Sequence, residues 1–339
     1  MERILLGFAP GVRVRFADRE RGLQRIRGLA EQGTGLPVVI YGPEGCGKTA
    51  LLRQAASVLR EHGYEVLYVN ALAETLEAGV VATPGLSKAL RELLRSVIGE
   101  RVSRIAESVS LLVREALRRL EKPRLAVLLD DAFQAIGLSR VEAYVKQLLD
   151  LIEHPGPEYD RLVVMVTSSE GRSRLLLARH LWSMSLYLWN MDKRGLGELY
   201  EQLPGDKPGL DDVWRVSGGN PRVVRILYTM GWSAERARDW LVEEKSLGLL
   251  LRSLGPGELE TLRLLVEDPA AAEEEVLGNQ GLLEKLIDRN LVMLVPRRRE
   301  ALWLDNVPPG RDKGLGIAGT IAWQTPLHRD AVAAALLSL

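Results

Sequence analysis

The sequence contains little cysteine and histidine, and both shortages narrow the range of functions. A single cysteine, Cys46, among 339 residues cannot form an intramolecular disulfide, which favours a reducing, intracellular setting. The four histidines (His62, His154, His180 and His328) are scattered without the spacing of metal ligands. We therefore expect no metal site built from cysteine and histidine.

The chain also lacks an excess charge and a long apolar run. Lys+Arg and Asp+Glu both number 45, so the net charge points neither to nucleic acid nor to a membrane surface. No stretch approaches the ~18 uninterrupted apolar residues of a membrane span, and the N-terminal apolar run is too short for a signal peptide. We expect a soluble, cytoplasmic protein with no membrane partner, long enough for about two domains.

The most informative stretch that is present is a glycine-rich loop. Residues 42–49 spell G-x-x-x-x-G-K-T, the pattern of a P-loop. The apolar run at residues 38–40 predicts a buried strand before the loop, and Thr49 opens a helix whose N-terminus would face an anion. Lys48 is expected to reach the β- and γ-phosphates of a nucleoside triphosphate, and the Thr49 hydroxyl to ligate Mg²⁺. The expected nucleotide contacts are Gly42, Pro43, Glu44, Gly45, Cys46, Gly47, Lys48, Thr49 and Ala50.

A second chemical landmark is a pair of carboxylates after an apolar strand. Residues 125–129 are apolar and close on Asp130 and Asp131, which is typical of a Walker B strand. Asp130 would hold Mg²⁺ through water, and Asp131 would lie where a base for the attacking water is needed. The alternative is that both aspartates belong to a solvated turn. No metal beyond the Mg²⁺ of the nucleotide is expected.

Two further stretches resemble a known family. Residues 16–26 are similar to the F-x-x-R-E-x-E-L entry segment of archaeal P-loop ATPases related to the STAND and AAA+ groups, although Gly22 replaces the usual acidic residue. Residues 218–222, Gly-Gly-Asn-Pro-Arg, resemble the lid region of the same family. The resemblance implies ATP rather than GTP, with the entry segment beside the adenine.

The resemblance also implies roles for single residues. Arg222 would be a sensor of the γ-phosphate, and an ordinary surface arginine is the alternative. Thr167 or Ser168, at the tip of the strand predicted over residues 160–168, would be a second sensor, unless the hydroxyls only cap the following turn. The family usually has glutamate at the position of Asp131, and the shorter aspartate puts the turnover rate in doubt.

Beyond residue 246 the pattern changes to three helices at residues 258–266, 270–277 and 279–290. A hairpin formed by residues 291–296 and 300–304 would follow, which is the plan of a winged helix. Winged helices often bind DNA, but residues 246–339 carry 10 Lys+Arg against 13 Asp+Glu. Only Arg297, Arg298 and Arg299 form a concentrated basic patch, so we expect weak DNA binding at most.

These observations predict an α/β fold: a P-loop NTPase of the additional-strand type with strand order 5-1-4-3-2, a helical lid and a C-terminal winged-helix domain. The expected boundaries are 1–195 for the ATPase core, 196–245 for the lid and 246–339 for the winged helix. The predicted function is a slowly hydrolysing, ATP-dependent switch that exchanges ATP and ADP and meets a protein partner or a second copy. Two alternatives stay open: a DNA-acting AAA+ relative, such as an initiator, a loader or a transposition regulator, and a scaffold that holds nucleotide without turnover.

Overall fold

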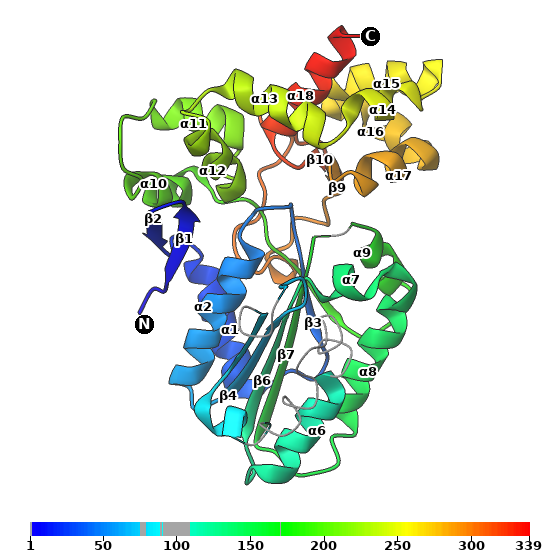
Figure 1. Cartoon of the computed structure of the whole chain (residues 1–339). Helices are drawn as coiled ribbons and strands as arrows, with labels where there is room; N and C mark the ends of the chain where they lie inside the picture. Colours follow the sequence, from blue (N-terminus) through cyan, green and yellow to red (C-terminus); the bar gives the residue numbers. More distant parts are fainter. Residues whose placement is uncertain (1, 75–78, 89, 91–108, 170) are drawn as a thin grey trace. The chain divides into compact units, whose positions relative to one another are not determined.

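The computed structural model describes residues 2–74, 79–88, 90, 109–169 and 171–339 (Figure 1). By internal contacts the chain forms two compact units. The sheet unit contains the N-terminal residues up to Ile4, Glu20–Tyr41 and Lys48–Tyr187; the helical unit contains Leu5–Arg19, Gly42–Gly47 and Leu188–Leu339. The predicted P-loop therefore belongs to the helical unit, and the helix that follows it by a single peptide bond belongs to the sheet unit.

In the described part of the chain, the sheet unit is built on six strands in the order β5-β4-β6-β7-β3-β8. The strands are β3 (Val38–Tyr41), β4 (Glu65–Asn70), β5 (Val80–Ala82), β6 (Arg124–Asp130), β7 (Arg161–Ser168) and β8 (Met184–Tyr187). Neighbouring strands run parallel except β5, which is antiparallel to β4. Numbering the parallel strands in chain order gives 5-1-4-3-2, so the predicted order is confirmed. The additional strand β7 lies between β3 and β6.

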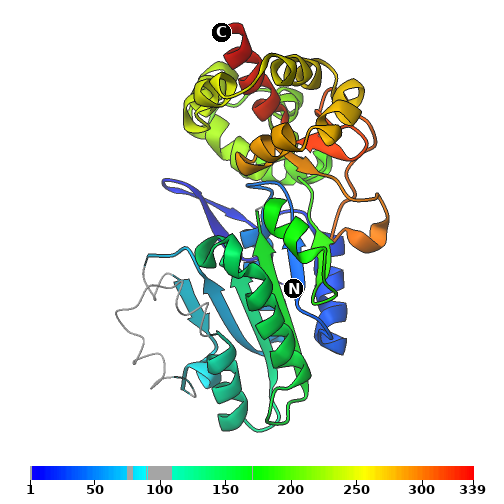
Figure 2. The same ribbon diagram turned by 90° about the vertical axis from the view of Figure 1, so that its right-hand side faces the viewer.

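Helices cover both faces of this sheet, as right-handed crossovers require. They are α1 (Glu20–Gln32), α2 (Lys48–Glu61), α6 (Val109–Arg119), α7 (Ala132–Ile136), η1 (Leu138–Arg140), α8 (Val141–Glu153) and α9 (Gly171–Leu177). Helices α1 and α2 lie on one face, and α6 and α8 lie on the other (Figures 1 and 2). The apolar residues from Leu86 to Val97 have helical spacing, which predicts a helix there. Most of this stretch lies outside the described residues, and Leu86 and Leu90 are buried.

The helical unit combines a hairpin with a larger set of helices. The hairpin is β1 (Leu5–Ala9) with β2 (Val12–Arg15). The helices are α10 (Lys193–Glu201), α11 (Leu210–Ser217), α12 (Pro221–Thr229), α13 (Ala234–Glu244), α14 (Leu247–Arg252), α15 (Pro256–Glu267), α16 (Pro269–Gly278), α17 (Gln280–Asp288) and α18 (Pro326–Leu337). A short antiparallel pair, β9 (Val292–Leu294) with β10 (Ile321–Trp323), and the 3-10 turn η2 (Glu300–Leu302) complete it.

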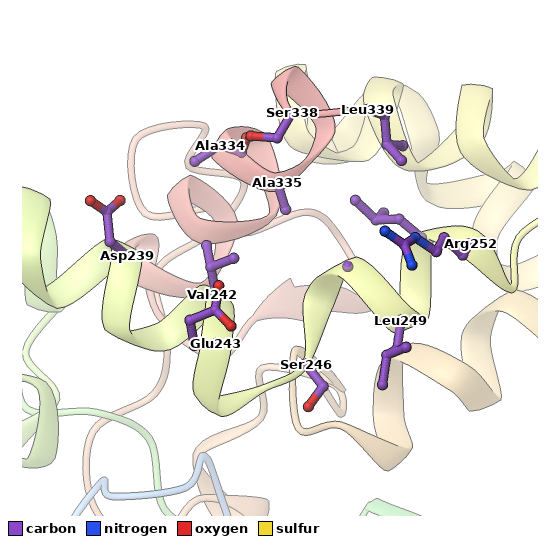
Figure 3. A pocket seen from close by; sticks show the side chains of 12 residues that line it. Asp239, Val242, Glu243, Ser246, Leu249, Arg252, Ala334, Ala335, Ser338 and Leu339 are labelled. Atoms are coloured by element: carbon purple, nitrogen blue, oxygen red, sulfur yellow. The ribbon is translucent and has the colours of Figure 1, made fainter.

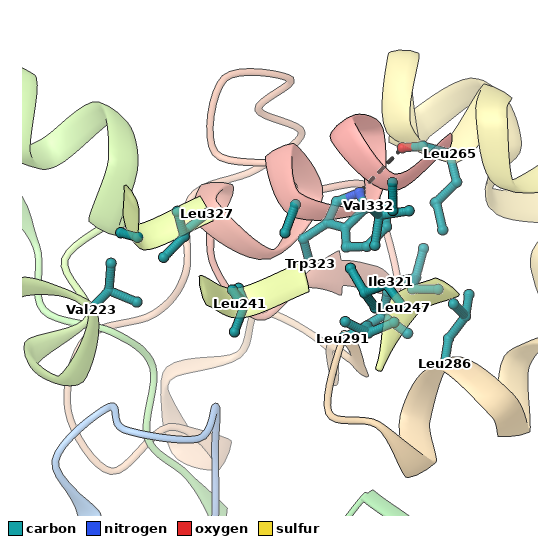
Figure 4. Close-up of a cluster of buried hydrophobic side chains, with 14 of the residues drawn as sticks. Val223, Leu241, Leu247, Leu265, Leu286, Leu291, Ile321, Trp323, Leu327 and Val332 are labelled. Carbon is teal, nitrogen blue, oxygen red and sulfur yellow. Dashed lines mark hydrogen bonds between the residues drawn. The ribbon is translucent and has the colours of Figure 1, made fainter. Parts of the chain in front are cut away.

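One hydrophobic core holds the helical unit together. Leu241, Leu247 and Leu286 come from three helices and pack in the same cluster as Ile321 and Trp323 of β10 (Figure 4). The indole N–H of Trp323 donates to the carbonyl oxygen of a residue in α15 at 3.2 Å, so this large side chain is buried without an unsatisfied donor. The regions predicted as lid and winged helix share this core.

The prediction of the hairpin formed by residues 291–296 and 300–304 is wrong in one respect. The three helices occur close to the expected positions, but residues 300–302 form η2, and the strand that pairs with β9 is β10. Trp303 is fully buried, and Arg298 donates to the backbone carbonyls of Pro309, Ala318 and Gly319. These contacts fold residues 295–320 into a long connection, and the next apolar run supplies the return strand. The winged-helix assignment and the three domain boundaries stay predictions.

Within the described residues, no helix is both long enough and apolar enough to cross a membrane.

Candidate functional site

The carboxylate of Asp130 lies at the end of β6, where side chains from several elements of the sheet unit meet. Among the described residues, three hydroxyl groups donate to it. Thr49, at the start of α2, and Thr167, on β7, donate to Oδ1 at 3.2 and 2.6 Å, and Tyr68, on β4, donates to Oδ2 at 2.8 Å. Burial raises the pKa of Tyr68, and the Asp130 charge raises it further, so the phenol stays protonated as a donor.

This donor set fits a magnesium ion that arrives with a nucleotide. Mg²⁺ prefers oxygen ligands and is usually bound through one or two protein groups plus phosphate oxygens and water. Thr49 and Asp130 supply a hydroxyl and a carboxylate 3.2 Å apart. In the described ranges, no group of three or more His, Cys, Asp or Glu side chains could hold a metal by itself. The residues therefore match a shared, nucleotide-dependent ion rather than a dedicated protein cage.

Asp131 adopts a backbone conformation that most residues avoid. Its φ is +50°, in the left-handed region, and it precedes α7 without capping that helix through its side chain. Its backbone N–H donates to the Thr167 hydroxyl at 3.1 Å. Thr167 thus contacts both acidic residues at once. Strained backbone of this kind is common where a side chain must be aimed.

The two hydroxyls at the end of β7 have different partners. Thr167 faces Asp130, whereas the Ser168 hydroxyl lies 3.0 Å from the Ser173 hydroxyl of α9. Of the two sensor candidates, the structure brings Thr167 to the acidic pair, and the Ser168 hydroxyl is bonded to α9.

The P-loop has the backbone that its glycines predict. Gly45 and Gly47 have φ of +78° and +102°, which are accessible to glycine at low cost. The space around Gly47 is open, whereas a side chain on Gly45 would overlap the Cβ of Arg222. Lys48 begins α2 and is only 5% exposed. Successive N–H groups in such a turn form an anion-binding concavity, so the loop fits a phosphate group.

Asn220 joins the start of α12 to the P-loop within the helical unit. Its Oδ1 accepts from the backbone N–H groups of Arg222 and Val223, which caps the helix, and Pro221 occupies the first turn. Its Nδ2 donates to the carbonyl of Glu44 at 2.9 Å, and the Arg222 N–H reaches the carbonyl of Gly45 at 3.3 Å. An Asn-Pro pair is a known signal for the start of a helix. The sequence did not predict that Asn220 also binds the P-loop.

Glu44, in the variable part of the P-loop, contacts Gln324, near the end of the chain, and Lys245, at the end of α13. Its N–H donates to Gln324 Oε1 at 2.7 Å, and its carboxylate pairs with Lys245 at 3.1 Å. Burial alone would raise the pKa of Glu44, but Lys245 and Arg222 lower it more, and the net pKa lies below its usual value. Nearby, burial lowers the pKa of His328 to about 3, so this imidazole is neutral at pH 7.

Arg19 is a further contact of the P-loop that the sequence did not reveal. Its guanidinium is buried, donates to the carbonyls of Cys46 and Trp189 at 2.8 and 2.9 Å, and pairs with Asp305 at 3.2 Å. A buried arginine needs this kind of complete pairing, since an unpaired charge would be strongly destabilising. The sequence contains one indication of a role for Arg19, which is that it lies in the entry segment at residues 16–26.

Three arginines, Arg172, Arg174 and Arg179, follow β7 in the chain, and the sequence leaves two interpretations for them: a solvated helix face, or an arginine finger directed at a neighbouring subunit. Arg174 lies over the ring of Tyr187, 4.9 Å from its centre, and Arg179 is exposed. The solvated helix face stays the favoured interpretation, and the arginine finger stays the alternative.

A cavity of about 560 Å³ lies elsewhere in the helical unit (Figure 3). Asp239 and Glu243 of α13, Leu249 and Arg252 of α14 and Ala335 of α18 are among the residues that line it. It shares no lining residue with the P-loop or with the contacts described above, and we assign it no role.

The sheet order, the P-loop and the acidic end of β6 together define a P-loop protein of the additional-strand class. A family model described as the ATPase domain predominantly from Archaea matches residues 16–227, and the chain belongs to this family. The match covers the entry segment, the P-loop, the Asp130–Asp131 pair and the start of α12.

Curated relatives match over short segments only. The chain is 43% identical over 53 residues to the chromosomal replication initiator protein DnaA 1 of Chlamydia muridarum, which is 15% of this chain and 12% of that protein. It is 56% identical over 34 residues to DnaA 1 of Chlamydia pneumoniae, or 10% and 7% of the two chains. The chain thus spans about an eighth or less of each relative.

Solved structures align over more of the chain at low identity. The Aeropyrum pernix ORC1 protein in complex with DNA is 16% identical, with 95% of this chain and 93% of that chain covered and a TM-score of 0.41. AMPPCP-bound DnaA from Aquifex aeolicus is 13% identical, with 78% and 80% covered and a TM-score of 0.35.

Proposed function

We propose that this protein binds ATP with Mg²⁺, hydrolyses it slowly, and acts as a switch that distinguishes ATP from ADP. The backbone of Gly42–Gly47 would surround the phosphates, and Ala50 would extend the contact into α2. Lys48 would supply the positive charge toward the β- and γ-phosphates, while Thr49 and Asp130 would hold the metal. When bound, the metal neutralises charge that develops on the transferred phosphoryl group.

Asp131 is the residue that we assign as the base for the attacking water. Its position beside the metal-binding Asp130 and its bond to Thr167 support this role. Thr167 would then respond to the γ-phosphate, because it is bonded to both acidic residues. The aspartate is one methylene shorter than the glutamate of related ATPases, which supports slow turnover.

One observation supports the proposal of a nucleotide-dependent switch. The P-loop is hydrogen-bonded to elements that are distant in the sequence. Asn220, Lys245 and Gln324 contact Glu44, and Arg19 contacts Cys46. A ligand shifts a conformational equilibrium only if it interacts differently with the two states. Contacts made by the phosphate-binding backbone itself provide such a difference, because a change in the loop alters α12, the end of α13 and the start of α18 directly.

Arg222 is the proposed sensor, and it provides the experiment that tests this function. A charge-assisted contact to the γ-phosphate exists with ATP and not with ADP, so Arg222→Ala should narrow the affinity gap between ATP and ADP by about 1.5–3 kcal/mol. Calorimetric titration of the full chain with each nucleotide measures the gap.

Arg225→Ala serves as the matched control, since Arg225 is an exposed arginine one turn further along the same helix. It should leave the gap unchanged. If the ratio of the affinities for ATP and ADP is the same in Arg222→Ala as in the wild type, Arg222 is an ordinary surface arginine and not a sensor.

A DNA-acting function is the second candidate, and the names of the relatives and of the aligned structures are what favour it. The charges of this chain do not favour it. Arg298 is bonded to backbone carbonyls, and Lys285, on α17, pairs with Glu258 at 2.9 Å. Arg297 and Arg299 stay exposed. We therefore rank DNA contact as weak, below a protein partner or a second copy. The third candidate is a protein-interaction scaffold, which would hold nucleotide structurally without hydrolysing it.

A further inference from the structure

Tyr68 is a buried tyrosine outside every motif that the sequence analysis used. It is 3% exposed and lies on β4, next to β6. The register pairs Tyr68 with Leu128 and Asn70 with Asp130, so the phenol ring extends past one residue pair to reach the acidic end of the neighbouring strand. Its hydroxyl donates to Asp130 Oδ2 at 2.8 Å.

The two oxygens of Asp130 are fixed from different directions. Oδ1 accepts from Thr49 and Thr167, and Oδ2 accepts from Tyr68. A carboxylate that is bonded at one oxygen can still rotate, whereas one bonded at both oxygens keeps a single orientation. An ionised carboxylate has about four lone-pair sites, so these bonds still leave it capacity to accept from a metal-bound water.

Arg53 connects Tyr68 back to the helix that carries Thr49. Its Nε donates to the Tyr68 hydroxyl at 3.3 Å, and its guanidinium carbon lies 5.8 Å from the centre of the tyrosine ring. Arg53 is four residues after Thr49 on α2, and its side chain is on the exposed side of the helix. The contacts Thr49–Asp130–Tyr68–Arg53 therefore form a closed ring on α2, β6 and β4.

We propose that Tyr68 is a positioning residue for the metal-binding carboxylate: it holds Oδ2 of Asp130 so that the carboxylate is already oriented when the nucleotide brings Mg²⁺. This inference rests on the proposed ATP·Mg²⁺ function. Groups that orient a metal-binding side chain are worth about tenfold or more in metal affinity in well-studied sites. Tyr68 would act on the metal only through Asp130, without touching it.

The test is the Mg²⁺ dependence of nucleotide binding by Tyr68→Phe, measured with a fluorescent ATP analogue in the full chain. The expected result is a Mg²⁺ midpoint about tenfold higher than in the wild type. Affinity for the metal-free nucleotide, measured with EDTA, should stay within about twofold, since no contact to the phosphates is removed. This separation of metal from nucleotide affinity would not result from a general loss of stability.

Tyr64→Phe is the matched control. Tyr64 directly precedes β4, is also 3% exposed, and donates its hydroxyl to the carbonyl of Ala30 at 2.6 Å, so the variant loses a comparable buried hydrogen bond that does not involve Asp130. Its Mg²⁺ midpoint should equal that of the wild type. An equal rise in both tyrosine variants would overturn the inference.

An unchanged midpoint in a folded Tyr68→Phe protein would also overturn it. If that variant does not fold, Arg53→Met removes the second contact of Tyr68 from an exposed position and should raise the midpoint in the same direction by a smaller factor; no rise would overturn the inference. A wild-type protein that binds the analogue without any response to Mg²⁺ would refute the proposed metal site and this inference with it, while nucleotide binding would stand. Failure of the wild type to bind the analogue at all would refute the proposed function together with the inference.

Discussion

Lys48→Ala is expected to lower the affinity for ATP·Mg²⁺ by two to three orders of magnitude or more. Lys48 is buried at the first turn of α2, directly after the glycines whose N–H groups would surround the phosphates. Removing one partner of a buried charge pair costs about 3–5 kcal/mol, because the remaining charge is left without compensation. Calorimetry on the full chain measures the loss directly.

Lys146→Ala is the control for this variant, since Lys146 is a half-exposed lysine on α8 of the same unit. It should bind ATP as the wild type does. Equal affinity of the wild type and Lys48→Ala would refute the assignment of the P-loop.

Asp131→Asn is expected to keep ATP binding while lowering hydrolysis by roughly 10²-fold or more, the usual contribution of a positioned base. Asparagine has the same shape as aspartate and tolerates the left-handed φ of +50° at this position, so the backbone should not change. Phosphate release over time, at saturating ATP, measures the effect. Asp150→Asn, which alters an exposed carboxylate of α8, should hydrolyse at the wild-type rate.

Hydrolysis by Asp131→Asn at the wild-type rate would show that another group, with Gln134 the neighbouring candidate, activates the water. A wild-type protein that binds ATP and releases no phosphate would instead favour the scaffold over the hydrolysing switch.

Local patterns in the sequence were sufficient to predict the central part of this fold. The P-loop and the run ending in Asp130 each combine a short strand with a defined polar end, and the strand predicted over residues 160–168 is found as β7. Chain order and crossover handedness then restrict the sheet to few arrangements, of which 5-1-4-3-2 is the observed one. Pro221 at the first turn of α12 was predictable for the same reason, since helix starts have local signals.

The contacts that the sequence could not supply join residues that are far apart in the chain. Gln324 is 280 positions from its partner Glu44, and Lys245 is 201 positions from it. Tyr68 belongs to no motif of the sequence, because its hydroxyl reaches Asp130 only after β4 and β6 pair. The return strand of the wing was misassigned because burial of Trp303 and the internal bonds of Arg298 override the local hairpin pattern.

We infer that the nucleotide state of the P-loop is transmitted through the bonds of Glu44. Hydrogen exchange of the full chain, compared between ATP·Mg²⁺, ADP·Mg²⁺ and no nucleotide, tests it most directly. Both nucleotides should protect residues 42–49. Exchange should also differ between ATP and ADP in residues 219–224, 241–247 and 321–328, which contain the partners of Glu44. Equal exchange in those three segments with ATP and ADP, while residues 42–49 are protected by both, would contradict it.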